Sequence, residues 1–257
     1  MCLITFAYQS HPKYTLILAG NRDEFYARPT REAQFWGAEG EPDILAGKDL
    51  KAGGTWLGIN QDGRWGALTN YRDFNIQKQD PPSRGELVLD YLKSNNDGEI
   101  YLQKLLPTAD HYNGFNLLLG DENGLYHMLN QEQEIQTIKP GIHGLSNASL
   151  NTPWLKVKKA KERLKEIINQ PEIKKEDLFN LLLDEDKAPD GTLPATGLSG
   201  EMEKAVSSIF IKTENYGSRC STLLLIDKEG NIDFTERRFK PGTTEMKGEQ
   251  HFNFEIT

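Results

Sequence analysis

The chain has 257 residues, of which 37% are hydrophobic and 26% charged, a composition typical of an ordinary, rather polar globular protein. Its formal net charge of −8 argues against non-specific nucleic-acid binding and against polybasic membrane association, because both need a basic surface. No segment approaches the roughly 20 consecutive apolar residues that cross a bilayer. We therefore expect a small-molecule partner, with no nucleic acid and no membrane insertion; the sequence indicates no oligomeric state.

Only two cysteines occur, Cys2 and Cys220. Two thiols so far apart form no disulfide framework, and no C-x-x-C or H-x-x-x-H pair indicates a metal site. The first apolar run lacks the basic segment that opens a signal peptide. We predict a protein of the reducing, cytoplasmic compartment that needs neither a metal nor a cofactor.

Hairpins dominate the first third of the chain. Two pairs of β-rich runs are each joined by a turn signal, which is Asp-Gly in the second pair. These runs are Leu3–Ala7 with Tyr14–Ala19, and Trp56–Asn60 with Trp65–Asn70. Residues 25–53, between the hairpins, have weak periodicity and many charges and glycines, so we expect an irregular excursion there.

Helices and strands then alternate in blocks. Ser83 and Glu86 form a capping box, which predicts a helix whose buried face holds Leu87, Val88, Tyr91 and Leu92. Further helices are expected at Ile100–Leu106, after Thr152, and at Lys175–Leu183. Further strands are expected at Phe115–Leu119, Leu125–Leu129, Ile135–Ile138, Ser207–Lys212, Ser221–Ile226, Ile232–Glu236 and Phe252–Ile256. Residues 187–200, rich in Pro and Gly, are expected to form a loop.

The helix after Thr152 has an amphipathic pattern. Its apolar positions are Val157, Ala160, Leu164 and Ile167, at the spacing of three and four that defines one helical face. Its lysines, from Lys156 to Lys165, are interpreted as a solvated face.

The order of elements predicts an α+β fold. Hairpin connections favour mostly antiparallel sheets, and helices grouped between strand blocks suit two stacked sheets with helices outside them. No internal repeat or low-complexity linker divides the chain. We expect one domain over residues 1–257.

Cys2 is the first candidate for chemistry. Methionine removal is efficient when the second residue is small, and it would leave one residue with both a thiol and an α-amine. The amine, with an ordinary pKa of about 7.7–8.0, is a general base beside a strong nucleophile. The alternative is that Cys2 only begins a buried strand as a small apolar residue.

The run Asn21-Arg22-Asp23-Glu24 follows the second expected strand. A hairpin between the first two strands brings the end of the second strand near Cys2. There Arg22 would favour the thiolate, and Asp23 or Glu24 would orient the amine. The alternative is a charged surface turn.

Three later residues are further candidates. Asn70 and Asn147 each end an apolar stretch, where a side-chain amide can donate to an oxyanion or, alternatively, cap a turn. Arg219 precedes an apolar strand and would bind a substrate carboxylate or support Cys2; the alternative is a surface ion pair. Trp56 ends a Gly-Gly-Thr-Trp turn and is expected to pack beside the pocket.

Taken together, these motifs resemble the NRDE family, the family of the transport and Golgi organisation protein 2. The resemblance spans nearly the whole chain, because many short motifs occur in one order. They are Met1-Cys2, Asn21-Arg22-Asp23-Glu24, Gly53-Gly54-Thr55-Trp56, Thr69-Asn70-Tyr71-Arg72, Ser83-Arg84-Gly85, Asn113-Gly114-Phe115-Asn116-Leu117, Gly144-Leu145-Ser146-Asn147, Thr152-Pro153-Trp154 and Ser218-Arg219-Cys220-Ser221-Thr222.

That family is similar in turn to N-terminal-nucleophile hydrolases of the choloylglycine hydrolase and penicillin V acylase type. The likeness implies a four-layer αββα sandwich with Cys2 as nucleophile at the start of a central strand. It places Arg22 with Asp23 or Glu24 beside the nucleophile, Asn70 and Asn147 near the oxyanion and amine, and Arg219 near a late arginine. Here Arg22 and Asp23 are adjacent, whereas the hydrolases separate them, so Glu24 is a second candidate for the Asp role. Candidate substrate-binding residues are Asn21, Trp56, Tyr71 and Arg72.

The resemblance leaves two main hypotheses open. The first is an amidohydrolase or acyltransferase that acts on a small non-peptide amide or acyl compound through Cys2. The second is a non-catalytic carrier that uses the same pocket, because members of the family have been linked to haem trafficking and to lipid or acyl-CoA metabolism. A third, an inert scaffold, predicts ordinary or buried thiol behaviour at Cys2.

Overall fold

The computed structural model describes residues 2–73 and 78–257. The chain divides into two compact units, each with its own sheet and helices. Unit 1 comprises residues 1–27 and 140–253, and unit 2 comprises residues 28–139 and 254–257. The segments of the two units therefore alternate along the chain. The single domain expected over 1–257 stays a prediction.

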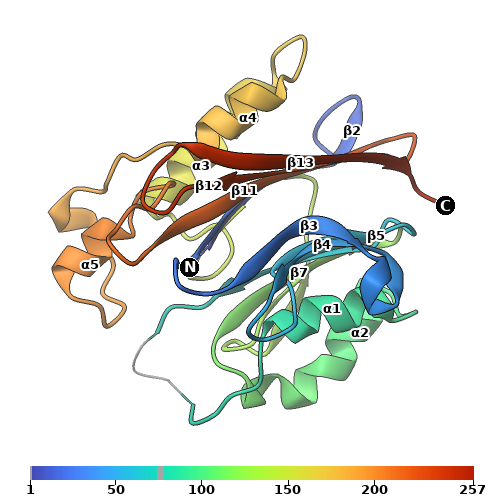
Figure 1. The fold of residues 1–257 in the computed structure, drawn as a ribbon, viewed down its shortest axis with the longest axis horizontal. Coiled ribbons are helices and arrows are strands. Elements are labelled where there is room, and N and C mark those ends of the chain that lie inside the picture. The colour runs from blue at the N-terminus through green and yellow to red at the C-terminus, as the bar shows by residue number, and fades with distance from the viewer. Residues whose placement is uncertain (1, 74–77) are drawn as a thin grey trace. The chain divides into compact units, whose positions relative to one another are not determined.

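Unit 1 is built on a six-stranded sheet, whose first five strands in spatial order pair antiparallel with one another. Its strands are, in spatial order, β10 (Gly141–Leu145), β1 (Cys2–Tyr8), β2 (Tyr14–Phe25), β11 (Tyr216–Asp227), β12 (Asn231–Phe239) and β13 (Met246–Glu255). Its helices are α3 (Leu155–Ile168), α4 (Lys175–Leu182) and α5 (Gly200–Ala205). In Figure 1, α3 and α4 lie along one face of this sheet.

Side-chain alternation along the strands fixes the two faces of this sheet. Leu3 on β1, Ala19 on β2 and Leu223 on β11 share one buried cluster with Leu164 of α3 and Phe179 of α4. Because successive strand residues point to opposite faces, the residues next to these in sequence face away from the helices. Cys2, directly before Leu3, is therefore on the helix-free face.

Unit 2 is built on a seven-stranded sheet, also antiparallel throughout. Its strands run in chain order: β3 (Thr30–Trp36), β4 (Glu41–Asp49), β5 (Leu57–Asn60), β6 (Trp65–Asn70), β7 (Phe115–Asp121), β8 (Gly124–Leu129) and β9 (Glu134–Thr137). Helices α1 (Gly85–Lys93) and α2 (Gly98–Leu105) pack on one face of this sheet (Figure 1). The buried cluster between them includes Tyr91 of α1 and Leu117 of β7.

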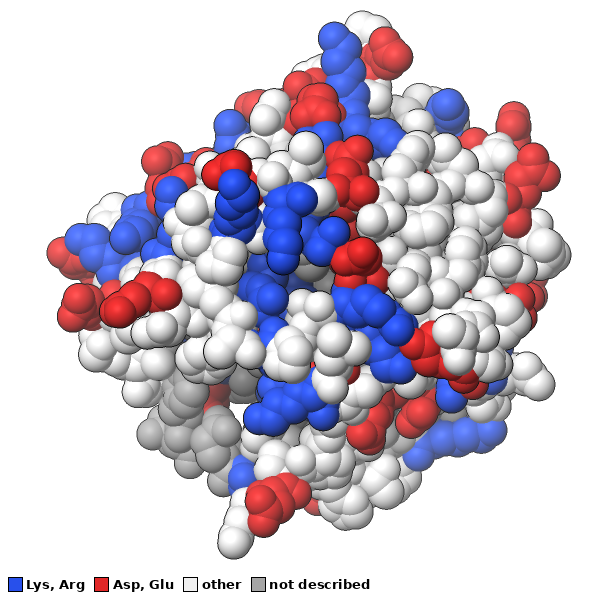
Figure 2. Space-filling model, viewed as in Figure 1, with Lys and Arg blue, Asp and Glu red and all other residues white. Residues whose placement is uncertain are grey.

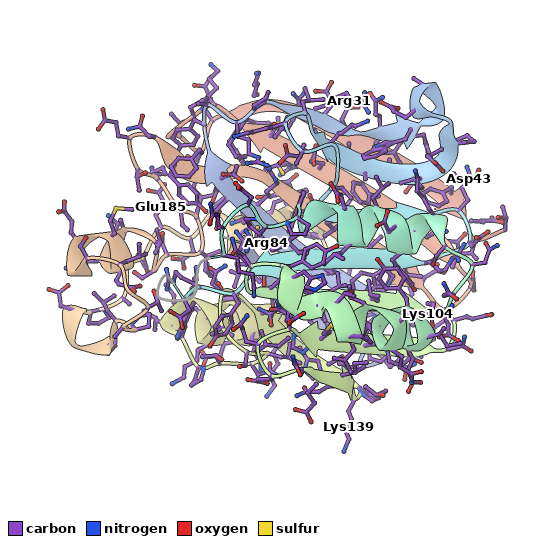
Figure 3. The ribbon with its side chains drawn as sticks, turned by 90° about the horizontal axis from the view of Figure 1, so that it is seen from below. Arg31, Asp43, Arg84, Lys104, Lys139 and Glu185 are labelled. Carbon is purple, nitrogen blue, oxygen red and sulfur yellow. The ribbon has the colours of Figure 1, made fainter. Side chains whose placement is uncertain are left out.

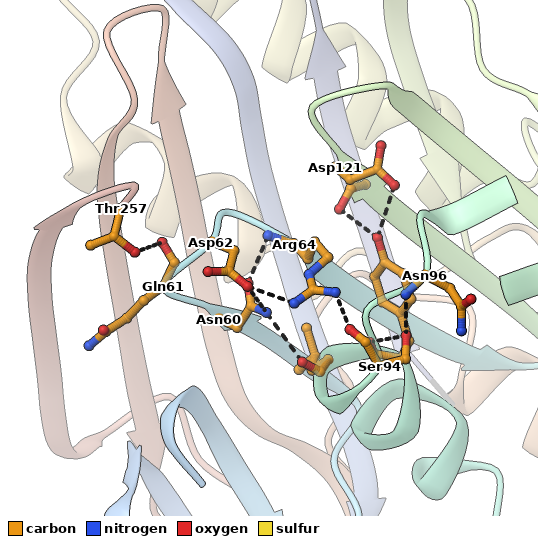
Figure 4. Close-up of polar contacts among 11 residues, drawn as sticks. Asn60, Gln61, Asp62, Arg64, Ser94, Asn96, Asp121 and Thr257 are labelled. Atoms are coloured by element: carbon orange, nitrogen blue, oxygen red, sulfur yellow. Dashed lines mark hydrogen bonds and ion pairs between the residues drawn. The ribbon is translucent and has the colours of Figure 1, made fainter. Parts of the chain in front are cut away.

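A polar network ties the β5–β6 turn to the end of α1 (Figure 4). The Arg64 guanidinium binds the Asp62 carboxylate at 2.6 Å and donates to the carbonyl of Ser94. Asn60 donates to the carbonyl of Leu92 at 3.2 Å. This network satisfies carbonyls at the carboxyl end of α1, which the helix itself leaves without partners.

The expected elements are largely confirmed, with four corrections. β2 extends through Phe25, so the Asn-Arg-Asp-Glu run lies within a strand rather than in a turn after it. Residues 25–53 hold β3 and β4, where we expected irregular backbone, because their side chains do not alternate cleanly in polarity. The expected strand at Ser207–Lys212 is absent apart from a single bridge at Lys212. The helix α1 has no side-chain cap, so the predicted capping box does not form.

Two further elements were not expected at all, β10 and α5. Both are short, of five and six residues, and α5 lies at the end of the predicted loop. The α+β class with two antiparallel sheets is confirmed. Each unit, taken by itself, has one sheet with helices on one of its faces. Within the described part of the chain, no helix is long and apolar enough to cross a membrane.

Candidate active site

Cys2 is the first residue of β1, which lies between β10 and β2 in the sheet of unit 1. The register places Arg22 of β2 directly opposite Cys2, and Cys220 of β11 on the other side of Arg22. The hairpin thus brings Cys2 and the Asn-Arg-Asp-Glu run together, as predicted from the sequence. Cys2 and Cys220 are two strands apart, about 10 Å, which is too far for a disulfide.

Asp23 lies beside the amino end of β1. It follows Arg22, the partner of Cys2, and the β2–β11 register pairs it with Ser218. The Ser218 hydroxyl donates to Asp23 Oδ1 at 2.5 Å, and the Tyr216 hydroxyl donates to the Asp23 carbonyl at 2.9 Å. Only 3% of Asp23 is exposed, and this burial raises the pKa of its carboxyl to about 6, although nearby positive charges and the Ser218 hydrogen bond act in the opposite direction.

The thiol of Cys2 is itself buried, with 8% of the residue exposed. Burial raises the pKa of the Cys2 thiol above its ordinary value, and the negative charge of Asp23 acts in the same direction. The backbone N–H of Asp23, which donates to the sulfur, and the positive charge of Arg22 both lower this pKa. Of the two acids predicted from the sequence, Asp23 is the one whose charge contributes to the pKa of Cys2, and the choice between Asp23 and Glu24 for the acid beside the nucleophile stays a prediction.

The backbone of Cys2 is held from the β10 side. Ser146, directly after β10, donates its hydroxyl to the Cys2 carbonyl at 3.0 Å. Its neighbour Asn147 is buried, and the two side chains are in contact, with Ser146 Oγ 3.1 Å from Asn147 Oδ1. The motif that contains these residues thus lies at the amino end of β1, on the opposite side from Arg22.

Arg22, Glu24 and Arg219 complete the charged part of the centre. Glu24 lies 3.8 Å from the Arg22 guanidinium and accepts from the backbone N–H of Phe25 at 2.8 Å. Arg219 is the extra residue where the β2–β11 register shifts between Ser218 and Cys220. Such β-bulges re-aim side chains and occur often beside active sites. Arg219 donates to the Phe25 carbonyl at 2.9 Å, and burial together with the charge of Arg22 lowers its pKa.

Asn21 is placed differently from its neighbours. Its side chain points to the helix face, where it donates to the carbonyls of Leu182 and Ile209 at 2.8 and 3.0 Å. Its oxygen accepts from the Ser221 hydroxyl at 2.6 Å. These contacts join β2 to three other segments of unit 1, so Asn21 stabilises the fold. Its expected role in substrate binding stays a prediction.

The remaining predicted residues belong to unit 2. Trp56, Asn70, Tyr71 and Arg72 lie before β5 and at the end of β6. Four sequence motifs meet at this end of the seven-stranded sheet. Gly85 accepts from the Thr55 N–H at 3.1 Å, and the Gly114 carbonyl accepts from both Tyr71 and Arg84, the latter labelled in Figure 3.

Gly54 explains why this meeting point needs glycine. A Cβ there would lie 2.3 Å from the backbone of Gly85, so the two segments pack with backbone against backbone. The roles that we predicted for Trp56, Asn70, Tyr71 and Arg72 stay predictions.

Three residues of unit 1 were not predicted from the sequence. Ser146 and Ser218 stand inside motifs that we singled out, but serine gives no chemical signal by itself. Lys156 was assigned to a solvated face, and this is wrong because only 2% of it is exposed. The spacing could have shown it: Lys156 lies four residues before Ala160 and eight before Leu164, on the buried stripe of α3.

Charges of both signs lie side by side on the surface face drawn in Figure 2.

Comparison with known proteins gives one family. The family model described as "Transport and Golgi organisation 2" matches residues 1–241. The Transport and Golgi organization 2 homolog of Mus musculus is 39% identical over 258 residues, covering 92% of each chain. The homolog of Homo sapiens is 38% identical with the same coverage, and the Drosophila melanogaster protein is 29% identical, covering 92% of this chain and 91% of its own.

Two solved structures are similar at low sequence identity. One is a Caenorhabditis elegans N-acylethanolamine-hydrolyzing acid amidase ortholog, at a TM-score of 0.43, with 10% identity and coverage of 87% of this chain and 92% of that one. The other is the C2A mutant of the conjugated bile acid hydrolase of Clostridium perfringens, at a TM-score of 0.49, with 8% identity and coverage of 99% and 92%. Both TM-scores are below 0.5, so the proposal that follows rests on the residues of this chain.

Proposed function

The chain belongs to the Transport and Golgi organisation 2 family, and we propose that it is a cysteine N-terminal-nucleophile amidohydrolase or acyltransferase. Its substrate would be a small non-peptide amide or acyl compound. Removal of Met1, which lies outside the described residues, is part of the proposal. The nucleophile is the thiol of Cys2, and the base is the α-amine of the same residue.

The proposed reaction proceeds in two halves. The α-amine takes the proton from the Cys2 thiol as the sulfur attacks the substrate carbonyl carbon. The tetrahedral oxyanion then collapses to a thioester, and the leaving amine takes the proton back from the α-ammonium. Water or an acceptor amine attacks the thioester, which releases the acid or the new amide and regenerates the thiol.

One observation carries this proposal: four polar groups converge on the amino end of β1. Arg22 lies opposite Cys2, and the Asp23 N–H donates to the sulfur. The buried Asp23 carboxylate lies where it can hold the α-ammonium, and Ser146 fixes the Cys2 carbonyl. A cysteine that merely filled a core would need none of these groups, because burying ionisable residues is unfavourable unless they are paired.

The test is intact-protein mass spectrometry combined with a pH titration of thiol alkylation. Cys2→Ala removes the proposed nucleophile, and Cys220→Ala is the matched control. Burial and the charge of Glu236 raise the pKa of Cys220 well above its ordinary value, so this thiol should contribute little. We expect a mass without Met1. With Met1 removed, the α-ammonium belongs to Cys2 itself, and its charge should lower the pKa of the thiol against the effect of burial. We therefore expect Cys2 to alkylate with an apparent pKa below the ordinary value of about 8.5.

Retention of Met1 would contradict the nucleophile mechanism, because no α-amine would then adjoin the thiol. Alkylation of Cys2 only at high pH, at the rate of a buried thiol, would contradict it as well. The next experiment is an activity screen on a panel of small fatty and aromatic amides. We expect the wild type and Cys220→Ala to hydrolyse members of this panel, and Cys2→Ala to hydrolyse none.

A second candidate function has one specific observation in its favour. Burial raises rather than lowers the pKa of the Cys2 thiol, and a protonated, buried thiol is a poor nucleophile. This favours a non-catalytic carrier of a small ligand such as haem or a lipid acyl group. The carrier predicts retained ligand binding with no turnover of any acyl substrate. Both functions suit a reducing, cytoplasmic compartment, because Cys2 and Cys220 are free thiols.

A further inference from the structure

Lys156 is a buried cation that its own helix does not favour. It occupies the first turn of α3, where the positive end of the helix dipole repels a cation. Only 2% of the residue is exposed, and its ammonium donates to the carbonyl of Val206 at 3.1 Å. A neutral carbonyl does not offset the loss of hydration of a full charge, so a buried lysine requires an anion nearby.

Asp23 is a buried carboxyl on which the charge of Lys156 acts. Strand alternation puts Asp23 on the same face of β2 as Asn21, whose side chain bonds to the end of α4. Val206, whose carbonyl binds the Lys156 ammonium, shares a buried cluster with Tyr216, and the Tyr216 hydroxyl donates to the Asp23 carbonyl at 2.9 Å. These contacts bring Lys156 toward Asp23, and the positive charge of Lys156 lowers the pKa of the Asp23 carboxyl. Asp23 is itself buried, so each charge lies in a low-dielectric setting in which their attraction is strong.

We propose that Lys156 is a positioning residue, whose buried ammonium keeps the Asp23 carboxylate ionised beside the amino end of β1. An ionised Asp23 holds the α-ammonium of Cys2 by a charge-assisted hydrogen bond. A protonated Asp23 would form a weaker hydrogen bond with this group. This inference rests on the proposed function for its purpose. The pairing of Lys156 with Asp23 is nevertheless testable without any enzymatic activity.

Several other groups bond to Asp23 or act on it through their charge, and they must be included. Ser218 and Tyr216 come from β11, Arg22 from β2 and Cys2 from β1. Ser218 and Arg22 lower the pKa of Asp23, as Lys156 does, whereas burial raises it. The helix α5, just before Val206, carries the buried Glu203, whose carboxylate accepts from the N–H of Thr196 at 3.0 Å.

The experiment is an NMR titration of the protein with aspartate labelled at its side-chain carboxyl carbon. The resonance of Asp23 is identified by its loss in Asp23→Asn. We expect an inflection near pH 6 in the wild type. In Lys156→Met, which keeps the length of the side chain and removes the charge, it should move upward by roughly one pH unit or more. Lys156→Arg should restore it to within a few tenths of a unit.

Lys158→Met is the matched control, because Lys158 is exposed on the same helix two residues away. It should leave the inflection unchanged. A shift of less than about a third of a pH unit in Lys156→Met, or an equal shift in Lys158→Met, would overturn the proposal. Circular dichroism establishes that each variant folds, and Lys156→Gln replaces Lys156→Met if the latter does not.

The failure of this inference and the failure of the proposed function are separable in the same samples. Intact mass reports whether Met1 is removed, and the Asp23 resonance reports the pairing with Lys156. Retained Met1 with a shifted resonance contradicts the nucleophile and supports the pairing. Removed Met1 with an unshifted resonance supports the nucleophile and contradicts the pairing.

Discussion

Two groups of buried polar side chains, one in each unit, differ in kind. In unit 1, Asp23 and Lys156 are ionisable and nearly without exposure. On the helix-free face of the unit 2 sheet the buried groups form a neutral row. In that row Asn116 donates to the Thr69 hydroxyl at 3.3 Å and accepts from His127 at 2.9 Å. A neutral row, bonded across three strands, specifies register at little cost, whereas buried charges cost stability wherever they occur.

The difference indicates which of the two regions is kept for chemistry. Perturbed ionisable groups gather at functional sites because catalysis needs them, although structural ion pairs are perturbed as well. In the neutral row, burial lowers the pKa of His127 to about 4, so it stays uncharged. Its Nε2 carries the proton toward Asn116, since the amide of Asn116 is already directed at Thr69. The comparison can be tested by removing members of either set.

The largest effect is expected at Asn21, the neutral exception beside the charged centre. Asn21→Ala leaves the carbonyls of Leu182 and Ile209 and the Ser221 hydroxyl without their buried partner. We expect a loss of about 4 kcal/mol in the free energy of unfolding. Urea unfolding measures it, with Ser221→Ala, which removes one bond only, as the milder control. A loss below about 1 kcal/mol would return Asn21 to the candidates for substrate binding.

His127 gives the next effect, through pH. Its folded pKa of about 4 is below the unfolded value of 6.5, so the unfolded chain binds more protons between these two pH values. Stability due to His127 is therefore present above pH 6.5 and is lost as the pH falls toward 4. Relative to His127→Gln, the wild type should lose about 3 kcal/mol between about pH 7 and pH 4. Parallel pH curves for the two proteins would contradict the buried, neutral assignment.

Asp23 should show a slightly smaller effect of opposite sign. Its folded pKa of about 6 lies above the ordinary 3.8, so here the folded state binds more protons in that range. Relative to Asp23→Asn, the wild type should lose about 2.5 kcal/mol as the pH rises from about 4 to 7. Urea unfolding at the two pH values measures it. If the free energy of unfolding of the wild type instead rises relative to that of Asp23→Asn over this pH range, the carboxylate is better paired than its burial indicates.

Local sequence patterns predicted most of the fold and part of the site. The hairpin signals and the alternation of β1 and β2 brought Arg22 and Asp23 to Cys2, because an antiparallel register follows from a short turn. The strands β3 and β4 escaped prediction because their exposed positions carry no regular alternation. The burial of Lys156 was not predicted, because a lysine in a lysine-rich helix is expected to face solvent even where its spacing fits the buried stripe. The proposed reason for its burial, Asp23, lies on a strand far away in the sequence.

Ser146 offers the smallest effect and the finest test of the charged centre. Its hydroxyl donates to the Cys2 carbonyl at 3.0 Å, a neutral bond within a group of charges. Ser146→Ala should lower the free energy of unfolding by about 1 kcal/mol, the usual net value of one hydrogen bond. If the bond only stabilises the fold, thiol reactivity at Cys2 is unchanged. If it aligns the amino end of β1, as the proposed nucleophile requires, the alkylation rate of Cys2 falls while that of Cys220 does not, because Cys220 lies two strands away.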